Sequence, residues 1–119
     1  MKGTIKTINE LLTTKQISCV ELTEKYLRAI EQDNPSLNAY VKVTPDLALD
    51  SAKEIDERIA KNLPLGPLAG VPMTLKDNIS TRGIETTCCS KMLENYVPIY
   101  DATVWELLQN QGTVLLGKT

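Results

Sequence analysis

The sequence predicts an α/β fold in which helices come first and short strands follow. In the first half, apolar residues return every three or four positions behind recognisable helix caps, as they do along amphipathic helices. In the second half, two short apolar runs flank one further helical segment, an order typical of parallel strands joined by a right-handed crossover. The 119 residues, 42% of them hydrophobic and 24% charged, suffice for one domain or a piece of one.

Three helices are expected before residue 62. The capping box places Ser or Thr at a helix start and Glu three residues later. Two sites have this pattern: Thr7 with Glu10, and Ser18 with Glu21. The helix after Ser18 should end near Asp33, because Asn34-Pro35 disfavours its continuation. Its apolar stripe consists of Cys19, Leu22, Thr23, Tyr26, Leu27 and Ile30.

The third helix is predicted to open at Thr44-Pro45, since proline is well tolerated in a first helical turn. Its buried face is expected at every third or fourth residue: Ala48, Ala52, Ile55 and Ile59. The apolar run 39–43, between the second and third helices, is a candidate strand.

The composition changes at Leu63. Five prolines and glycines fall within the nine residues 64–72, which excludes a helix and predicts a tight approach to a strand at Val71–Leu75. Charged and polar residues, Lys76-Asp77-Asn78, then replace the apolar ones and end this strand. An irregular segment, 80–100, follows.

A fourth helix is predicted after Asp101, whose carboxylate is a suitable N-cap, and Gly112 is suited to close it. Its apolar face is expected at Val104, Leu107 and Leu108. The last strand should cover Thr113–Leu116.

The last eight residues, Gly112–Thr119, satisfy the P-loop pattern GxxxxGK[ST]. A working P-loop follows a strand, precedes a helix and turns its variable residues toward phosphate. Here a helix is predicted before the pattern, and the variable residues are the best strand formers nearby. We therefore interpret the pattern as a strand leaving a helix cap and predict no nucleotide site.

The composition excludes several classes of site. The chain contains no histidine, so it supplies neither a Ser-His-Asp triad nor a Cys/His zinc site, and a general base would be Lys, Asp or Glu. The three cysteines, Cys19, Cys88 and Cys89, form no CxxC pair, and small buried thiols in a reducing compartment are the expectation. No metal site is expected.

The charge and hydropathy of the chain bear on its surroundings. A formal net charge of −2 without a basic stripe predicts no nucleic-acid contact by this segment. No apolar stretch is long enough to cross a bilayer, and the first four residues lack the apolar core of a signal peptide. We therefore expect a cytoplasmic protein with no membrane contact.

The stretch Gly66–Asn78, GPLAGVPMTLKDN, is the most informative part of the chain. Four spaced matches follow it: Thr86-Thr87-Cys88, Ser90-Lys91-Met92-Leu93, Tyr100-Asp101-Ala102-Thr103-Val104 and Gly117-Lys118-Thr119. With them, the sequence closely resembles the amidase-signature family. Within the family it is most similar to the A subunits of the bacterial glutamyl-tRNA(Gln)/aspartyl-tRNA(Asn) amidotransferases, chiefly through residues 86–88 and 90–93. Cys89 departs from these subunits, which more often have a small residue such as Ala there.

The resemblance implies hydrolysis without histidine. A nucleophilic serine passes its proton to a second serine, held on a cis peptide, and that serine passes it to a lysine. The triad lysine falls on Lys76, directly after a predicted strand, where α/β folds gather functional groups. A lysine acts as a base only in its neutral form; on position alone, a solvated surface charge is the commoner outcome. The implied reaction attacks the side-chain amide of glutamine and releases ammonia from a glutamyl-enzyme.

The resemblance also implies how the chain is organised. Residues 1–62 would form an N-terminal helical region with one short strand, and residues 63–119 the start of the α/β core with its mixed β-sheet. In the family, the glycine- and serine-rich stretch that supplies both serines and the oxyanion hole lies beyond the position of Thr119. We therefore expect a truncated chain with an incomplete sheet, inactive alone and prone to self-association through unpaired strand edges.

The implied partners are a B subunit, which handles ATP, Mg²⁺ and the misacylated tRNA, and a small C subunit that wraps the pair. Glutamine is the implied amide donor, and no cofactor is expected in this chain. Two alternatives stay open. One is another amidase acting on a small amide; the other is a non-enzymatic module that docks through helix faces around Leu22 and Ala52.

Overall fold

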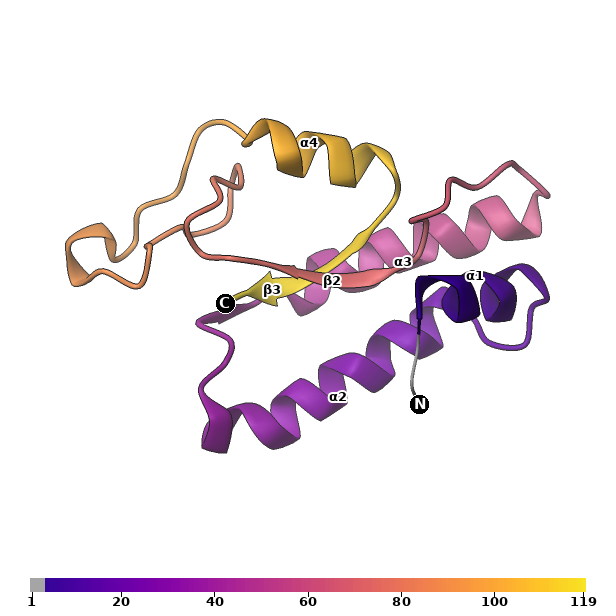
Figure 1. Ribbon diagram of the computed structural model, residues 1–119, viewed down its shortest axis with the longest axis horizontal. Coiled ribbons are helices and arrows are strands. Elements are labelled where there is room, and N and C mark those ends of the chain that lie inside the picture. The colour runs from indigo at the N-terminus through magenta and orange to yellow at the C-terminus, as the bar shows by residue number, and fades with distance from the viewer. Residues whose placement is uncertain (1–3) are drawn as a thin grey trace.

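The computed structural model describes residues 4–119 and has two layers of helices around a small sheet (Figure 1). The three strands lie in the order β1-β3-β2, with β3 (Val114–Lys118) in the middle. Helices α1 (Ile5–Thr13), α2 (Cys19–Leu37) and α3 (Pro45–Ala60) lie on one side, and α4 (Thr103–Asn110) lies on the other. The predicted α/β class, with a mixed sheet, is confirmed.

The start of α1 differs from the prediction. Thr4, not Thr7, is the N-cap: its side chain accepts a hydrogen bond from the Thr7 backbone N–H at 3.2 Å. Both threonines have a suitable hydroxyl, and the helix begins one turn earlier because the first of them already caps it. Glu10 therefore lies inside the helix, 4.0 Å from Lys6 on the preceding turn. The first three residues, on which the signal-peptide prediction partly rests, lie outside the described chain.

The capping box of α2 is confirmed, but its predicted end is wrong. Ser18 accepts from the Glu21 N–H at 3.0 Å, and the Glu21 carboxylate accepts from the Ser18 N–H at 2.9 Å. The helix continues through Pro35 to Leu37. Proline removes one N–H donor, yet the last turn is closed by Asn38, which donates to the Asn34 carbonyl at 2.7 Å from a left-handed conformation (φ 49°).

Strand β3 pairs in opposite senses with its two neighbours. It runs antiparallel to β1 (Lys42–Val43), which is shorter than the predicted 39–43, and parallel to β2 (Pro72–Leu75), as predicted. The handedness of the crossover stays a prediction. Gly117 permits the close approach of β1, since a Cβ there would lie 2.2 Å from the Lys42 carbonyl oxygen.

The core has one cluster on each face of the sheet. On one face, Val114 and Leu116 of β3 pack against α1, α2 and α3. The predicted face of α3 is confirmed, with Ala48, Ala52 and Ile55 buried and Ile59 half-buried. On the other face, Leu115 packs with Leu75 and Trp105. Alternate residues of β3 thus point to opposite layers, as the pleat requires.

Helix α4 is rotated relative to the prediction. Asp101 is not its cap: the N-cap is Ala102, and the Asp101 carboxylate accepts from the Arg82 backbone N–H at 2.6 Å. Trp105 is the buried residue and Leu108 is half-buried. The predicted Val104 and Leu107 are 48% and 63% exposed, because the large indole, not the aliphatic pair, fills the space over β3. Gly112 closes the turn as expected, at φ 77°.

Between β2 and α4 the chain is irregular apart from the 3₁₀ turn η1 (Lys91–Leu93), as predicted for residues 80–100. None of the helices in residues 4–119 is both long and apolar enough to span a membrane. The core cluster that includes Ile8 also includes Leu116, so the helical region and the strands share it.

Candidate active site at the carboxyl ends of strands β2 and β3

The parallel strands β2 and β3 place their carboxyl ends at the same edge of the sheet. Leu75, the last residue of β2, is in register with Lys118, the last of β3. Pairing continues beyond both: the Thr119 N–H donates to the Leu75 carbonyl at 2.9 Å, and the Asp77 N–H donates to the Thr119 carbonyl at 2.6 Å. In open α/β sheets, this edge is where functional side chains gather.

Lys76 lies at this edge with an exposed side chain. It lines a hollow of about 190 Å³. The other residues of the hollow are Asp77, Asn78, Cys88, Cys89 and Thr119. Within residues 4–119, no hydrogen bond or ion pair holds the Lys76 ammonium. Only the backbone around Lys76 is held by hydrogen bonds, and this backbone directs the side chain to the edge of the sheet.

Asp77, the next residue, is buried where Lys76 is exposed: only 2% of its surface is accessible to solvent. Its Oδ2 accepts from the Thr87 backbone N–H at 3.1 Å and from the Thr87 hydroxyl at 2.5 Å. Its carbonyl accepts from the Cys88 N–H at 2.8 Å. Asp77 therefore joins the end of β2 to the loop that forms the other wall of the hollow.

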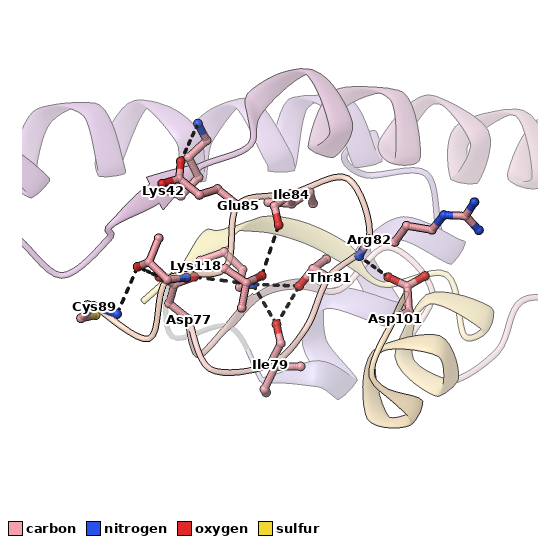
Figure 2. A network of polar contacts seen from close by, with 12 residues as sticks. Lys42, Asp77, Ile79, Thr81, Arg82, Ile84, Glu85, Cys89, Asp101 and Lys118 are labelled. Atoms are coloured by element: carbon pink, nitrogen blue, oxygen red, sulfur yellow. Dashed lines mark hydrogen bonds and ion pairs between the residues drawn. The ribbon is translucent and has the colours of Figure 1, made fainter. Parts of the chain in front are cut away.

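Lys118 is fully buried beside Asp77, at the centre of a polar network (Figure 2). Its ammonium donates to the Ile79 carbonyl at 2.9 Å and to the hydroxyls of Thr81 and Thr86 at 2.8 and 2.9 Å. It also lies 3.7 Å from Asp77 Oδ1. Burial lowers the pKa of Lys118, and the nearby Asp77 carboxylate opposes that shift.

The P-loop pattern has no P-loop geometry. The residues that would have to form a phosphate-binding loop are strand β3, and the pattern's lysine is the buried Lys118. All three N–H donors of that ammonium are used by protein acceptors. The rejection of a nucleotide site on the sequence pattern agrees with this arrangement.

The three cysteines are free thiols in two different settings. Cys19 is buried, as expected, and burial together with the Asp56 carboxylate raises the pKa of its thiol to about 12. For Cys88 and Cys89 the expectation of burial is wrong. Both occupy left-handed backbone positions (φ 52° and 55°) in the loop after Thr87, where the turn carries them to the surface of the hollow.

Comparison with known proteins identifies the family. Residues 21–119 match the family profile described as Amidase. The chain belongs to the amidase family. The resemblance stated on sequence motifs is thereby confirmed, and the irregular loop with its polar network is part of an amidase-family segment.

Several amidase-family relatives are glutamyl-tRNA(Gln) amidotransferase A subunits. That of Carboxydothermus hydrogenoformans is 53% identical over 114 residues, which is 96% of this chain and 24% of the relative. That of Thermoanaerobacter pseudethanolicus is 49% identical over 116 residues, which is 98% of this chain and again 24% of the relative. The chain thus spans about a quarter of the length of these relatives.

Solved amidase structures share the fold. The peptide amidase of Stenotrophomonas maltophilia superposes with a TM-score of 0.92 at 32% identity, covering 99% of this chain and 24% of that one. A bacterial aryl acylamidase of the amidase-signature family gives a TM-score of 0.90 at 32% identity, covering 98% and 25%. The mixed α/β arrangement is therefore the amidase arrangement.

Sequence reasoning predicted Lys76 as the catalytic residue, which stays a prediction, but did not predict the contacts of Asp77 with Thr87 and Lys118. Asp77 and Thr87 lie among polar residues in the sequence, and Lys118 is itself a polar residue. The spacing of apolar residues therefore does not predict which of these three side chains point into the protein. All three lie within the quoted family motifs, and Lys118 also follows the apolar residues of β3 after one glycine, but neither signal shows that the three side chains contact one another. Among residues 4–119, no three acidic or cysteine side chains lie close enough together to hold a metal ion.

Proposed function

We propose that this chain is the N-terminal part of the glutaminase (A) subunit of a tRNA-dependent amidotransferase. The observation that carries the proposal is Lys76, exposed at the carboxyl edge of a parallel strand pair and next in sequence to the buried Asp77, in a chain 53% identical to such a subunit. The complete enzyme hydrolyses glutamine to glutamate and supplies the ammonia that converts Glu-tRNA(Gln) to Gln-tRNA(Gln).

Lys76 is the proposed general base. In its neutral form it takes the proton that a nucleophilic serine loses through a second serine. The serine oxygen attacks the side-chain amide carbon of glutamine, the C–N bond breaks, and the proton leaves with ammonia. Water then hydrolyses the glutamyl ester and returns the enzyme to its starting state. Both serines are assigned to other parts of the complete protein.

The proposed assembly separates the chemistry among subunits. This chain works with a B subunit, which binds ATP, Mg²⁺ and the misacylated tRNA, and with a C subunit. No residue of this chain is assigned to a cofactor or a metal. Its net charge of −2 supports a role away from the tRNA, and a cytoplasmic location accords with that of tRNA-dependent synthesis.

The alternative with specific support is an amidase acting on a small amide or a peptide amide. Its support is the TM-score of 0.92 with a peptide amidase at 32% identity. That identity is well below the 53% shared with the amidotransferase subunit, so the glutaminase is the better supported function.

A substrate panel separates the two functions. The complete natural protein, with and without its B and C subunits, is assayed for ammonia release from L-glutamine, a C-terminal peptide amide and an aryl amide. We expect kcat/KM for glutamine to exceed that for the peptide and aryl amides by about 100-fold or more. A site whose buried polar groups hydrogen-bond to glutamine would leave those groups without partners when another amide binds. Faster hydrolysis of the peptide or aryl amide, independent of partner subunits, would favour the alternative.

A further inference from the structure

We propose that Asp77, Thr87 and Lys118 are positioning residues for Lys76, which hold the backbone on either side of it in the one arrangement that serves catalysis. This inference rests on the proposed function, because it takes Lys76 as the base. None of the three side chains is proposed to touch the substrate. Their effect is transmitted through the strand end and the loop that together form the hollow around Lys76.

The backbone of Lys76 is fixed on both sides. Its predecessor Leu75 accepts from the Thr119 N–H at 2.9 Å, and its successor Asp77 donates to the Thr119 carbonyl at 2.6 Å. The Lys76 carbonyl itself accepts from the Ile79 N–H at 3.0 Å. These three bonds hold the backbone on both sides of Lys76, whereas its side chain has no hydrogen-bond partner among residues 4–119.

Thr87 connects this strand end to the opposite wall of the hollow. It donates to Asp77 Oδ2 through both its backbone N–H and its hydroxyl, at 3.1 and 2.5 Å. The same hydroxyl oxygen accepts from the Cys89 N–H at 3.1 Å. The Asp77–Thr87 contact therefore sets the distance between Lys76 and the turn at Cys88 and Cys89.

Lys118 holds the segment between Asp77 and Thr87 through hydrogen bonds. Its three donors hold the Ile79 carbonyl, Thr81 and Thr86, which lie along the segment between Asp77 and Thr87. Its positive charge faces Asp77 Oδ1 at 3.7 Å, an oxygen with no hydrogen-bond donor among residues 4–119. Without Lys118, Asp77 would be a buried carboxylate with no counter-charge, and the loop would have to rearrange to solvate it.

Thr87 offers an isosteric test. In the complete natural protein, Thr87→Val removes the hydroxyl but keeps the shape, whereas Thr87→Ser keeps the hydroxyl and loses a methyl group. We expect Thr87→Val to lower the kcat for ammonia release from glutamine by about 10- to 100-fold with KM little changed, because a displaced catalytic group costs rate more than binding. Thr87→Ser should retain a kcat close to that of the wild type.

A core variant controls for lost stability. Leu12→Ala removes a buried side chain of α1 that belongs to the cluster on the other face of the sheet. It should lower the melting temperature at least as much as Thr87→Val while leaving kcat unchanged at a temperature where both variants are folded. The proposal is overturned if Thr87→Val and Thr87→Ser have the same kcat, or if kcat simply follows the melting temperature across the three variants.

The Lys76→Ala variant separates this failure from a failure of the proposed function. If Lys76→Ala is inactive but Thr87→Val keeps the wild-type kcat, only the positioning role is wrong. If Lys76→Ala still releases ammonia from glutamine, Lys76 is not the base and the positioning role fails with that assignment, whereas the substrate panel alone decides whether the protein is a glutaminase.

Discussion

Lys118 has a charged group where an apolar side chain would ordinarily lie. A buried ammonium is stable only when its donors and its charge are both satisfied. Three protein oxygens accept its hydrogen bonds and Asp77 supplies the opposite charge. Replacing a buried ion pair by apolar side chains of similar size is often neutral for stability, whereas removing one partner alone is destabilising, so Lys118 and Asp77 depend on each other.

Cys19 is a second buried ionisable residue, and its titration is expected to affect stability at high pH. Burial, reinforced by Asp56, raises the pKa of its thiol from 9.0 to about 12 in the folded protein. Above pH 9 the unfolded chain loses this proton while the folded protein keeps it. The contribution of Cys19 to the free energy of unfolding is therefore fully present below pH 9. Above pH 9 this contribution falls by up to about 1.4 kcal/mol per pH unit until pH 12.

Urea unfolding at pH 8 and pH 10.5 checks this, with Cys19→Ala as the comparison. The stability advantage of the wild type over Cys19→Ala should shrink by roughly 2 kcal/mol between the two pH values. The opposite contribution of Lys118, whose lowered pKa makes stability rise with pH, is present in both proteins and cancels. An advantage that is the same at both pH values would show that the folded protein does not retain the Cys19 proton.

At the scale of elements, the contact between the start of α2 and helix α3 depends on one carboxylate. Asp56 of α3 accepts from the backbone N–H groups of Cys19 and Val20, at 2.7 and 3.0 Å, in the first turn of α2. A negative charge at this position also complements the helix dipole. The capping box supplied by Ser18 and Glu21 satisfies other donors of the same turn, so α2 begins with nearly all of its free N–H groups bonded.

We expect Asp56→Ala to lower the free energy of unfolding by about 1–3 kcal/mol, because it leaves two partly buried N–H donors without an acceptor. Chemical denaturation provides the measurement. Asp50→Ala is the matched control: Asp50 lies on the same helix, is exposed and, within residues 4–119, pairs only with Lys53, so its loss should cost less than about 0.5 kcal/mol. Equal effects of the two substitutions would mean that Asp56 does not hold the contact between α2 and α3.

Elements were predictable where one local signal acted alone. The Ser18–Glu21 cap, Pro45 at the start of α3 and the apolar runs of β2 and β3 each have one structural solution. The errors arose where two local solutions compete and packing decides between them. Either threonine could cap α1, and either of two faces of α4 could be buried until Trp105 filled the space over the sheet.

The site was predictable only in part, for the same reason. Lys76 follows from its place at a strand end and from the family motif. The inward turn of Asp77 and Lys118 depends on contacts between segments up to 41 residues apart in sequence, from position 77 to position 118, and no local pattern encodes such contacts.

At the scale of the whole molecule, β3 is the element around which the rest assembles. It is buried along its entire length, pairs on both edges and packs against helices on both faces. Both strand ends that form the candidate site therefore belong to, or pair with, a strand that is buried and hydrogen-bonded on both edges. This is the arrangement expected of a site whose catalytic group must be held within a fraction of an ångström.

The 119-residue chain by itself is expected to have no glutaminase activity. Within residues 4–119, no serine hydroxyl hydrogen-bonds to Lys76, so the proposed base has no nucleophile to activate. Ammonia release from glutamine by the purified chain should equal that of its Lys76→Ala variant. Release above that control would show that the chain contains a nucleophile of its own.

The most direct test of the central claim compares two lysine variants in the complete protein. Lys76 and Lys91 are both exposed, but only Lys76 lies at the strand edge in the hollow with Asn78 and Thr119. We predict that Lys76→Ala lowers the kcat for ammonia release by at least about 10²-fold, the usual range for loss of a general base being 10²–10⁴-fold. Its melting temperature should stay that of the wild type, and Lys91→Ala should keep full activity. A Lys76→Ala protein that retains most of its activity would contradict the account.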